Sequence, residues 1–267
     1  MPTPDIAVTL IGGPTALIEI GTMRLLTDPT FDPPGLYQKT PVHFEKISGP
    51  ALSLEEIGSL DGVLLSHDQH LDNLDHAGRA MLPSVAVTYT TIAGAGRLGG
   101  NALGLSPFET RVMGGKGTER LFVTAAPACH GPVGIEPISG DVIGFLLGVD
   151  QPGDAIYITG DTVWYEGTAE VARRFSPRVV MLFTGSAEPR GRFHMTMDSN
   201  DALEAAHSFP NAAIVAVHNE GWLHFKENAA ELAAAFATLG VASRLTALER
   251  GRRMVFQGSI PNPIGND

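Results

Sequence analysis

Short apolar segments recur along the whole chain. They are rich in Val, Ile, Leu and Ala and are bounded by Gly, Pro or polar residues, a pattern typical of buried β-strands. The predicted strands cover residues 6–11, 16–20, 63–65, 85–89, 121–124, 142–147, 155–159, 179–183 and 213–217. The spacing of these segments predicts a protein built on β-sheet.

Two alanine-rich segments in the second half of the chain have helical periodicity. Residues 198–209 begin at the candidate caps Asp198 and Ser199, and residues 228–239 end at Gly240, as expected of helix termini. The chain therefore combines strands with helices.

The order of these elements limits the fold class. The first 60 residues contain strands and loops, whereas the second half alternates strand and helix, so neither a simple βαβ array nor an all-β sandwich fits. We expect a mixed α+β (α/β) fold, with a layered sheet core and outer helices, in a single domain over residues 1–267. The segments 101–117 and 135–141 are rich in Gly and Pro and are expected to be surface loops.

Composition narrows the class of protein. Of the 267 residues, 43% are hydrophobic and 18% charged, which indicates a globular chain and excludes disordered and fibrous classes. The 18 Lys and Arg against 29 Asp and Glu give a net charge of −11, which repels polyphosphates and anionic lipid surfaces. We therefore expect no nucleic-acid partner. No stretch approaches the roughly 20 apolar residues that span a bilayer, so we expect no membrane insertion.

The cysteine content and the N-terminus indicate a cytoplasmic protein. Cys129 stands alone, which excludes an internal disulfide framework, and MPTPDIAVTL has neither the basic start nor the apolar run of a secretory signal. We interpret Cys129 as a small buried hydrophobic residue. Assembly into a homo-oligomer is compatible with this sequence but is not encoded by any pattern in it.

The segment VLLSHDQHLDNLDHAGR, residues 63–79, has a high density of potential metal ligands. The predicted strand ends at Leu65, and the next eleven residues hold three His and three Asp. Imidazole and carboxylate groups at this density are typical ligands of a divalent metal. The alternative is an exposed polar loop in which Asp72 caps a helix that runs toward Ala80.

Three other predicted strands end in the same kinds of residue. Cys129 and His130 follow the strand at 121–124, Asp161 follows 155–159, and His218 directly follows 213–217. Because functional groups commonly lie on loops at one edge of a rigid sheet, we expect these strand ends to converge on one site.

Six motifs in order carry a family resemblance over residues 6–226. They are IGGPTALIEIGTMRLLTDPTFD, SHDQHLDNLD, CHGP, TGDT, HMTMDSNDALEAA and VHNEGWLHF. Together they resemble the metallo-β-lactamase superfamily, and within it the branch of ascorbate-phosphate lactonases and N-acyl-phosphatidylethanolamine phospholipase D-like hydrolases. The resemblance implies a four-layer αββα sandwich with a metal site at one edge of its two sheets.

The first metal motif of this family departs from its usual spacing of His, any residue, His, any residue, Asp, His. If Gln69 is an insertion, His67 and His70 are the imidazoles of the first metal and Asp72 is the carboxylate of the second. Without an insertion, Asp68 takes the first His position. We favour His67 with His70, because imidazole suits zinc.

The resemblance assigns the other ligands. It implies His130 as the third ligand of the first metal, Asp161 as the carboxylate that bridges both metals, and His218 as the terminal ligand of the second. Asn73 stands where the family has a second-metal His, and a neutral amide is a poor zinc ligand, so the second site is weaker unless His76 joins it. One or two Zn²⁺ ions are expected, with Mn²⁺ and Fe²⁺ as alternatives.

Hydrolysis is the chemistry that these groups predict. A divalent ion lowers the pKa of bound water to near 7 and polarises a carbonyl or phosphoryl oxygen. Asp72 or Asp161 would then orient the metal-bound hydroxide and pass a proton to the leaving group. We favour Asp72 for this role.

Substrate contacts are sought near the motif that begins at His194. Arg190 and Arg192 could clamp an anionic group, and His194 could line the pocket; the alternatives are solvated arginines and a capping or packing histidine. His224 lies in the aromatic sequence GWLHF, so we interpret it as a packing residue and leave it out of the ligand set.

The sequence therefore predicts a metal-dependent hydrolase of a small-molecule lactone, ester, amide or phosphodiester. Two alternatives stay open: a mononuclear iron or di-iron redox enzyme on the same fold, and a non-catalytic metal-binding protein. A nuclease fits poorly with the net charge of −11 and the lack of a basic stripe.

Overall fold

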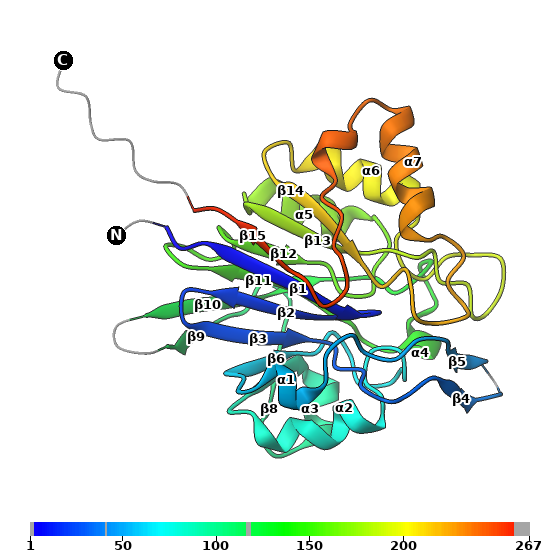
Figure 1. Cartoon of the computed structure of the whole chain (residues 1–267), viewed down its shortest axis with the longest axis horizontal. Helices are drawn as coiled ribbons and strands as arrows, with labels where there is room; N and C mark the ends of the chain where they lie inside the picture. The colour runs from blue at the N-terminus through cyan, green and yellow to red at the C-terminus, as the bar shows by residue number, and fades with distance from the viewer. Residues whose placement is uncertain (1–2, 41, 116–118, 259–267) are drawn as a thin grey trace.

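Two β-sheets face each other in the computed structural model, which describes residues 3–40, 42–115 and 119–258 (Figure 1). The first sheet has the strand order β15-β1-β2-β3-β6-β7-β8, and the second has the order β14-β13-β12-β11-β10-β9. The strands of the first sheet are β1 (Ile6–Gly12), β2 (Thr15–Ile20), β3 (Met23–Thr27), β6 (Gly62–Leu64), β7 (Thr88–Thr91), β8 (Ala102–Leu105) and β15 (Arg253–Phe256). The strands of the second are β9 (Thr110–Gly114), β10 (Arg120–Pro127), β11 (Ile143–Gly148), β12 (Ile156–Ile158), β13 (Val179–Phe183) and β14 (Ala213–Val217). A separate hairpin pairs β4 (Gly35–Gln38) with β5 (Phe44–Lys46).

Helices cover the outer face of each sheet. They are α1 (Leu54–Ile57), α2 (His76–Met81), α3 (Ile92–Leu98), α4 (Glu136–Ser139), α5 (Glu166–Arg174), α6 (Ser199–Ser208) and α7 (Ala229–Thr238), with 3₁₀ turns at Leu82–Ser84 and Ala242–Arg244. In Figure 1 helices α1 to α3 lie below the sheets, and α6 and α7 lie above them. Helix α4 lies at one edge, on the same side of the view as β4 and β5.

The main core lies between the two sheets. Successive side chains of a strand point to opposite faces, so Ile6 and Val8 of β1 face this core, where they share one cluster with Phe145 of β11 and Met181 of β13. All four side chains are 0–1% exposed. The sheets therefore form the two inner layers of the molecule.

A second and a third cluster attach the helices. Ala202 and Ala206 of α6 pack with Leu182 of β13, whereas Met81 of α2 packs with Val63 of β6 on the other side of the molecule. Each sheet thus carries its own helical layer. The four-layer αββα sandwich that the resemblance implied is confirmed.

Several predicted elements keep their positions, and others shift. The segment 198–209 forms α6, whose N-cap is Asp198, and 228–239 forms α7, whose N-cap is Asn228. The strand expected at 85–89 begins only at Thr88, because a 3₁₀ turn ends at Val85.

The prediction that two segments form surface loops is largely wrong. Residues 101–117 contain β8 and β9, and 135–141 contain α4; residues 116 and 117 lie outside the described part of the chain. Both strands are at sheet edges, and in each of them all residues but one are partly or fully exposed, so their sequences lack the continuous apolar pattern of the central strands.

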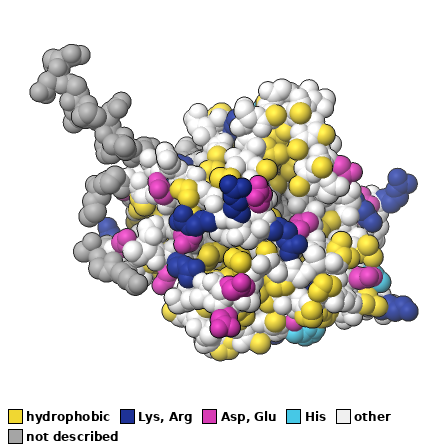
Figure 2. Space-filling model, viewed as in Figure 1, with side chains coloured by type: hydrophobic (Ala, Val, Ile, Leu, Met, Phe, Trp, Pro, Cys, Tyr) yellow, Lys and Arg dark blue, Asp and Glu magenta, His cyan; other side chains and the backbone are white. Residues whose placement is uncertain are grey.

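The surface carries mixed charge. On the face in Figure 2, Lys and Arg side chains are interspersed with Asp and Glu. Within the described ranges, no helix combines the length and the apolar character needed to cross a bilayer.

Candidate metal centre

The loop after β6 positions two histidines. The backbone N–H of Ser66 donates to Asp28 Oδ1 at 2.6 Å, and His70 O accepts from the N–H groups of Asn73 and Leu74, so the loop turns tightly over its own backbone. Helix α2 then starts, and Asp75 is its N-cap. The alternative in which Asp72 caps this helix is therefore wrong.

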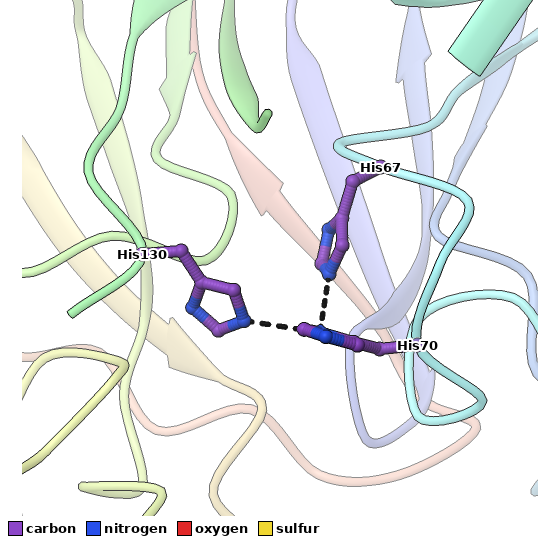
Figure 3. Close-up of side chains that lie close together, drawn as sticks. All are labelled: His67, His70 and His130. Atoms are coloured by element: carbon purple, nitrogen blue, oxygen red, sulfur yellow. Dashed lines mark hydrogen bonds between the residues drawn. The ribbon is translucent and has the colours of Figure 1, made fainter. Parts of the chain in front are cut away.

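Three imidazoles meet at the end of this loop (Figure 3). Nε2 of His67 lies 2.8 Å from Nδ1 of His70, and Nε2 of His130 lies 3.1 Å from the same atom. One Nδ1 lone pair can accept only one well-directed N–H, so a cation shared by all three accounts for the convergence better. Two nitrogens bound to one tetrahedral zinc lie roughly 3.3 Å apart. The spacing of the three rings fits a metal.

Neighbouring groups fix the orientation of these rings. His130 Nδ1 donates to the carbonyl oxygen of Met195 at 2.8 Å, which leaves Nε2 with a lone pair that points into the cluster. His67 Nδ1 lies 2.9 Å from Ser66 Oγ. Outer hydrogen bonds of this kind are what hold metal-binding imidazoles in one tautomer.

Electrostatics keeps two of the three imidazoles neutral. Burial, reinforced by the neighbouring histidines, holds the pKa of His67 well below its usual value. Burial and the proximity of His130 lower the pKa of His70 to about 3. Neutral imidazoles are the form that binds a metal.

A second cluster lies beside the first. Nε2 of His218 is 3.6 Å from Asp72 Oδ2 and 3.6 Å from Asp161 Oδ1, and all three residues are buried. Asp161 Oδ2 also lies 3.7 Å from Nε2 of His130, so this carboxylate faces both clusters. The six residues that the sequence singled out as ligands therefore lie together, in two adjoining groups of three.

The parallel strands of the second sheet bring this cluster together. Strand β12 pairs with β13, and β13 with β14, in parallel, so Asp161 and His218 leave the sheet at the same edge. Gly160 has φ +63, and a Cβ there would lie 2.7 Å from the Ile143 carbonyl oxygen. Glycine is thus required immediately before Asp161.

Opposed effects set the protonation of the second cluster. Burial would raise the pKa of Asp72, but the nearby charges of His224 and His218 and the hydrogen bond with His224 hold it well below its usual value. Burial would lower the pKa of His218, yet the carboxylates of Asp161 and Asp72 raise it. Within the described residues, Asp72 Oδ1 and both ring nitrogens of His218 have no hydrogen-bond partner. Buried polar atoms without partners are costly, and a cation would satisfy one ring nitrogen of His218 and a nearby carboxylate oxygen.

The structure places Asp68 away from the histidines. Its carboxylate accepts hydrogen bonds from Arg97 Nε at 3.0 and 3.1 Å, and its carbonyl oxygen accepts one from Arg79. His67 and His70 are the pair that converges, as in the alignment that treats Gln69 as an insertion.

Asn73 and His76 occupy different places from the second-metal histidine of the motif. Asn73 is fully buried and donates from Nδ2 to Asp161 Oδ1 at 3.1 Å. The side chain of His76 is 68% exposed and pairs with Asp32, so it does not reach the cluster.

One buried histidine that the sequence analysis left out lies at the site. His224 Nε2 is 2.9 Å from Asp72 Oδ2. Its ring also packs against Phe44 and Phe225, with centroid distances of 5.3 and 4.6 Å, so the predicted aromatic packing is present as well. The spacing of His218 and His224 within one strand-end loop was the signal that could have indicated this contact.

The three predicted substrate-binding residues lie in different environments. Arg190 lines a pocket of about 10 Å³ together with members of both clusters, room for about one water molecule or ion. Arg192 is exposed and is not among the lining residues. His194 Nε2 lies 3.2 Å from Asp201 Oδ2, so it is paired with the first turn of α6.

Comparisons with known proteins agree with this architecture. A family model described as beta-lactamase superfamily domain matches residues 23–219. The UPF0173 protein YddR of Bacillus subtilis (strain 168) is 22% identical over an alignment 270 positions long, which covers 93% of this chain and 99% of YddR.

Two solved structures share the fold. An isothiocyanate hydrolase from Delia radicum gut bacteria has 24% sequence identity and a TM-score of 0.80, with 95% of this chain and 100% of that chain covered. A possible metal-dependent hydrolase from Veillonella parvula DSM 2008 has 20% identity and a TM-score of 0.80, with 95% and 99% covered.

Proposed function

Because the chain belongs to the beta-lactamase superfamily domain family, we propose that it is a metal-dependent hydrolase of a small molecule. Its αββα sandwich is the metallo-β-lactamase fold. The observation that carries the proposal is the convergence of two ligand clusters at one sheet edge, formed by His67, His70 and His130 and by Asp72, Asp161 and His218. One or two Zn²⁺ ions suit these imidazoles and carboxylates.

Asp72 and Asp161 are proposed to have different roles in the reaction. When bound, a divalent ion lowers the pKa of water and polarises the oxygen of the bond to be broken. Asp72 Oδ1 is buried at the pocket and has no hydrogen-bond partner within the described ranges, so this carboxylate is placed to accept a hydrogen bond from the attacking water and to orient it. The side chain of Asp161 accepts a hydrogen bond from Asn73 and faces both clusters. This position suits Asp161 to bind a metal ion in either cluster.

The pocket has room only for a small group of a substrate, and its lining suits an anionic group next to an apolar part. Arg190 is the guanidinium that lines the pocket, and Val42, Phe44 and Met195 supply apolar surface. A guanidinium holds a carboxylate or phosphate through two hydrogen bonds. Lactones, esters and phosphodiesters therefore stay the proposed substrates, and the solved neighbour named as an isothiocyanate hydrolase adds isothiocyanates to the panel.

Hydrolysis is favoured over the iron redox chemistry that the sequence left open. Of the two solved neighbours with a TM-score of 0.80, one is named an isothiocyanate hydrolase and the other a possible metal-dependent hydrolase. The side chains at the site are imidazoles and carboxylates. With zinc bound, these groups are sufficient for hydrolysis, because zinc activates water without a change of oxidation state.

The test is turnover of a generic lactone, bis-nitrophenyl phosphate and an aryl isothiocyanate by the parent protein and by His130→Ala and Asp161→Ala. We expect each variant to lose about 100-fold or more in rate, while His43→Ala, which changes an exposed histidine, keeps the parent rate. Equal rates in all four proteins would defeat the hydrolase proposal.

A further inference from the structure

Two imidazoles from one loop approach the same carboxylate oxygen. Asp72 Oδ2 lies 2.9 Å from Nε2 of His224 and 3.6 Å from Nε2 of His218. His224 is 7% exposed, and it lines the pocket shared by the two clusters. Its Nε2 therefore faces the second cluster rather than solvent.

Asn73 brings no imidazole to this cluster, although its Oδ1 is buried without a hydrogen-bond partner within the described residues. Its Nδ2 is committed to a hydrogen bond with Asp161 Oδ1, and an amide nitrogen that donates a proton has no lone pair for a metal. Of the six residues in the two clusters, only His218 brings an imidazole to the second. A second imidazole there must come from elsewhere in the chain.

The backbone around His224 holds its ring at this position. The N–H of Leu223 donates to the carbonyl oxygen of Glu45 at 3.0 Å, which ties the loop to β5. Phe44 meets the ring edge-on, and the Phe225 ring lies 4.6 Å from the rings of both His224 and His218. His224 Nδ1 has no hydrogen-bond partner within the described ranges, so no other polar contact explains the burial of this ring.

We propose that His224 is a ligand of the second metal position, where it supplies the imidazole that Asn73 does not. The donor set is then Asp72, Asp161, His218 and His224. Two carboxylates and two imidazoles are a set that zinc accepts. The inference rests on the proposed function, since it concerns the same metal centre. In the metal-free protein the His224–Asp72 contact is a hydrogen bond, and its proton leaves when the ion binds.

The experiment counts metal ions rather than turnover. Parent protein, His224→Ala and His224→Gln are stripped with chelator, titrated with Co²⁺ and Zn²⁺ by equilibrium dialysis, and analysed for bound metal and for the Co²⁺ visible spectrum. We expect two ions in the parent and one tightly bound ion in each variant, with the second affinity weakened by about 100-fold or more. His43→Ala is the matched control and keeps both ions.

The glutamine variant separates a ligand from a positioning residue. Gln can donate a hydrogen bond to Asp72 but is a poor zinc ligand, so restoration of the second ion by His224→Gln would overturn the proposal in favour of a purely positioning role. A second ion that binds His224→Ala as tightly as the parent would also overturn it, as would a parent that holds a single ion.

These outcomes are distinct from failure of the proposed function. A single ion that is lost in His130→Ala but retained in His224→Ala defeats only this inference, whereas a parent protein that binds no metal defeats both. Circular dichroism of each metal-free variant verifies that it is folded, and the near-isosteric Gln variant provides the readout if the Ala variant is not.

Discussion

Arg97 holds the carboxylate of Asp68 through Nε at 3.0 and 3.1 Å, across 29 residues of sequence. This ion pair joins helix α3 to the loop that carries His67 and His70. It also holds the Asp68 side chain away from the three imidazoles. In this loop, His67 and His70 therefore face the site, whereas Asp68 faces helix α3.

Removal of the Arg97 side chain is expected to weaken metal binding without removing a ligand. Arg97→Ala leaves Asp68 without its main partner and frees the loop, so the affinity for the first ion should fall by about 10- to 100-fold. Isothermal titration with Zn²⁺ measures the change. Arg111→Ala breaks an exposed pair with Glu109 and should leave the affinity unchanged. An unaltered affinity in Arg97→Ala would show that the ion pair does not orient the loop.

Arg190 is expected to select anionic substrates. Arg190→Ala should raise the KM of a substrate with a carboxylate or phosphate about 10-fold, because the lost contact is worth about 1.4 kcal/mol, and should leave kcat nearly constant. Steady-state kinetics with charged and neutral substrates tests this. Arg192→Ala is the matched control, since Arg192 is exposed outside the pocket. The same KM effect on neutral substrates would contradict the assignment.

His70 is expected to make the metal-free protein sensitive to acid. Its pKa in the folded protein is about 3, below the ordinary value of 6.5, so protonation favours the unfolded chain. This contribution to stability is fully present above pH 6.5 and is lost as the pH falls, at about 1.4 kcal/mol per pH unit. Urea unfolding in chelator at pH 6.5 and 4.5 should show that His70→Gln loses about 2 to 3 kcal/mol less than the parent. Equal losses would contradict the lowered pKa.

The buried ion pair of Lys46 and Asp75 is expected to be essential for stability. Their side chains are 4% and 1% exposed, and Nζ lies 3.0 Å from Oδ2. Lys46→Ala should lower the free energy of unfolding by about 3 to 5 kcal/mol, because it leaves a buried charge without its partner. Lys46→Met, which preserves most of the volume, separates charge from packing and should also be destabilised. The exposed Lys39→Ala should change stability by less than about 0.5 kcal/mol.

Two helical glycines should respond in opposite directions to alanine. A Cβ at Gly78 would lie 1.8 Å from the Pro29 carbonyl oxygen, whereas one at Gly96 meets nothing within 4 Å. Gly78→Ala should therefore destabilise the protein by about 2 to 4 kcal/mol, and Gly96→Ala should stabilise it by about 0.5 to 1 kcal/mol. Thermal and chemical denaturation measure both. A neutral Gly78→Ala would mean that α2 can move away from Pro29 at little cost.

The sequence predicted those strands that have a clear local pattern of apolar residues. The apolar run 179–183 is strand β13, residue for residue, because both faces of that strand are buried. Edge strands such as β8 were missed because half-exposed positions carry no clear periodicity.

The site was predictable to the extent that ligands follow strand ends. His130, Asp161 and His218 could be found in this way, because a strand fixes where its last residue emerges. The contact between His224 and Asp72 spans 152 residues, and the position of Asp68 depends on Arg97. Such relationships arise only when the chain is folded, so no local pattern distinguishes them.

The β4–β5 hairpin contributes Phe44 to the pocket wall, yet it belongs to neither large sheet. Its anchorage runs through Lys46 and through backbone bonds to the loop 221–223. The part of the pocket wall that Phe44 supplies is therefore carried by a segment outside both large sheets, whereas His130, Asp161 and His218 follow strands of the second sheet. A change in the hairpin would therefore reshape the pocket wall without altering the register of either large sheet.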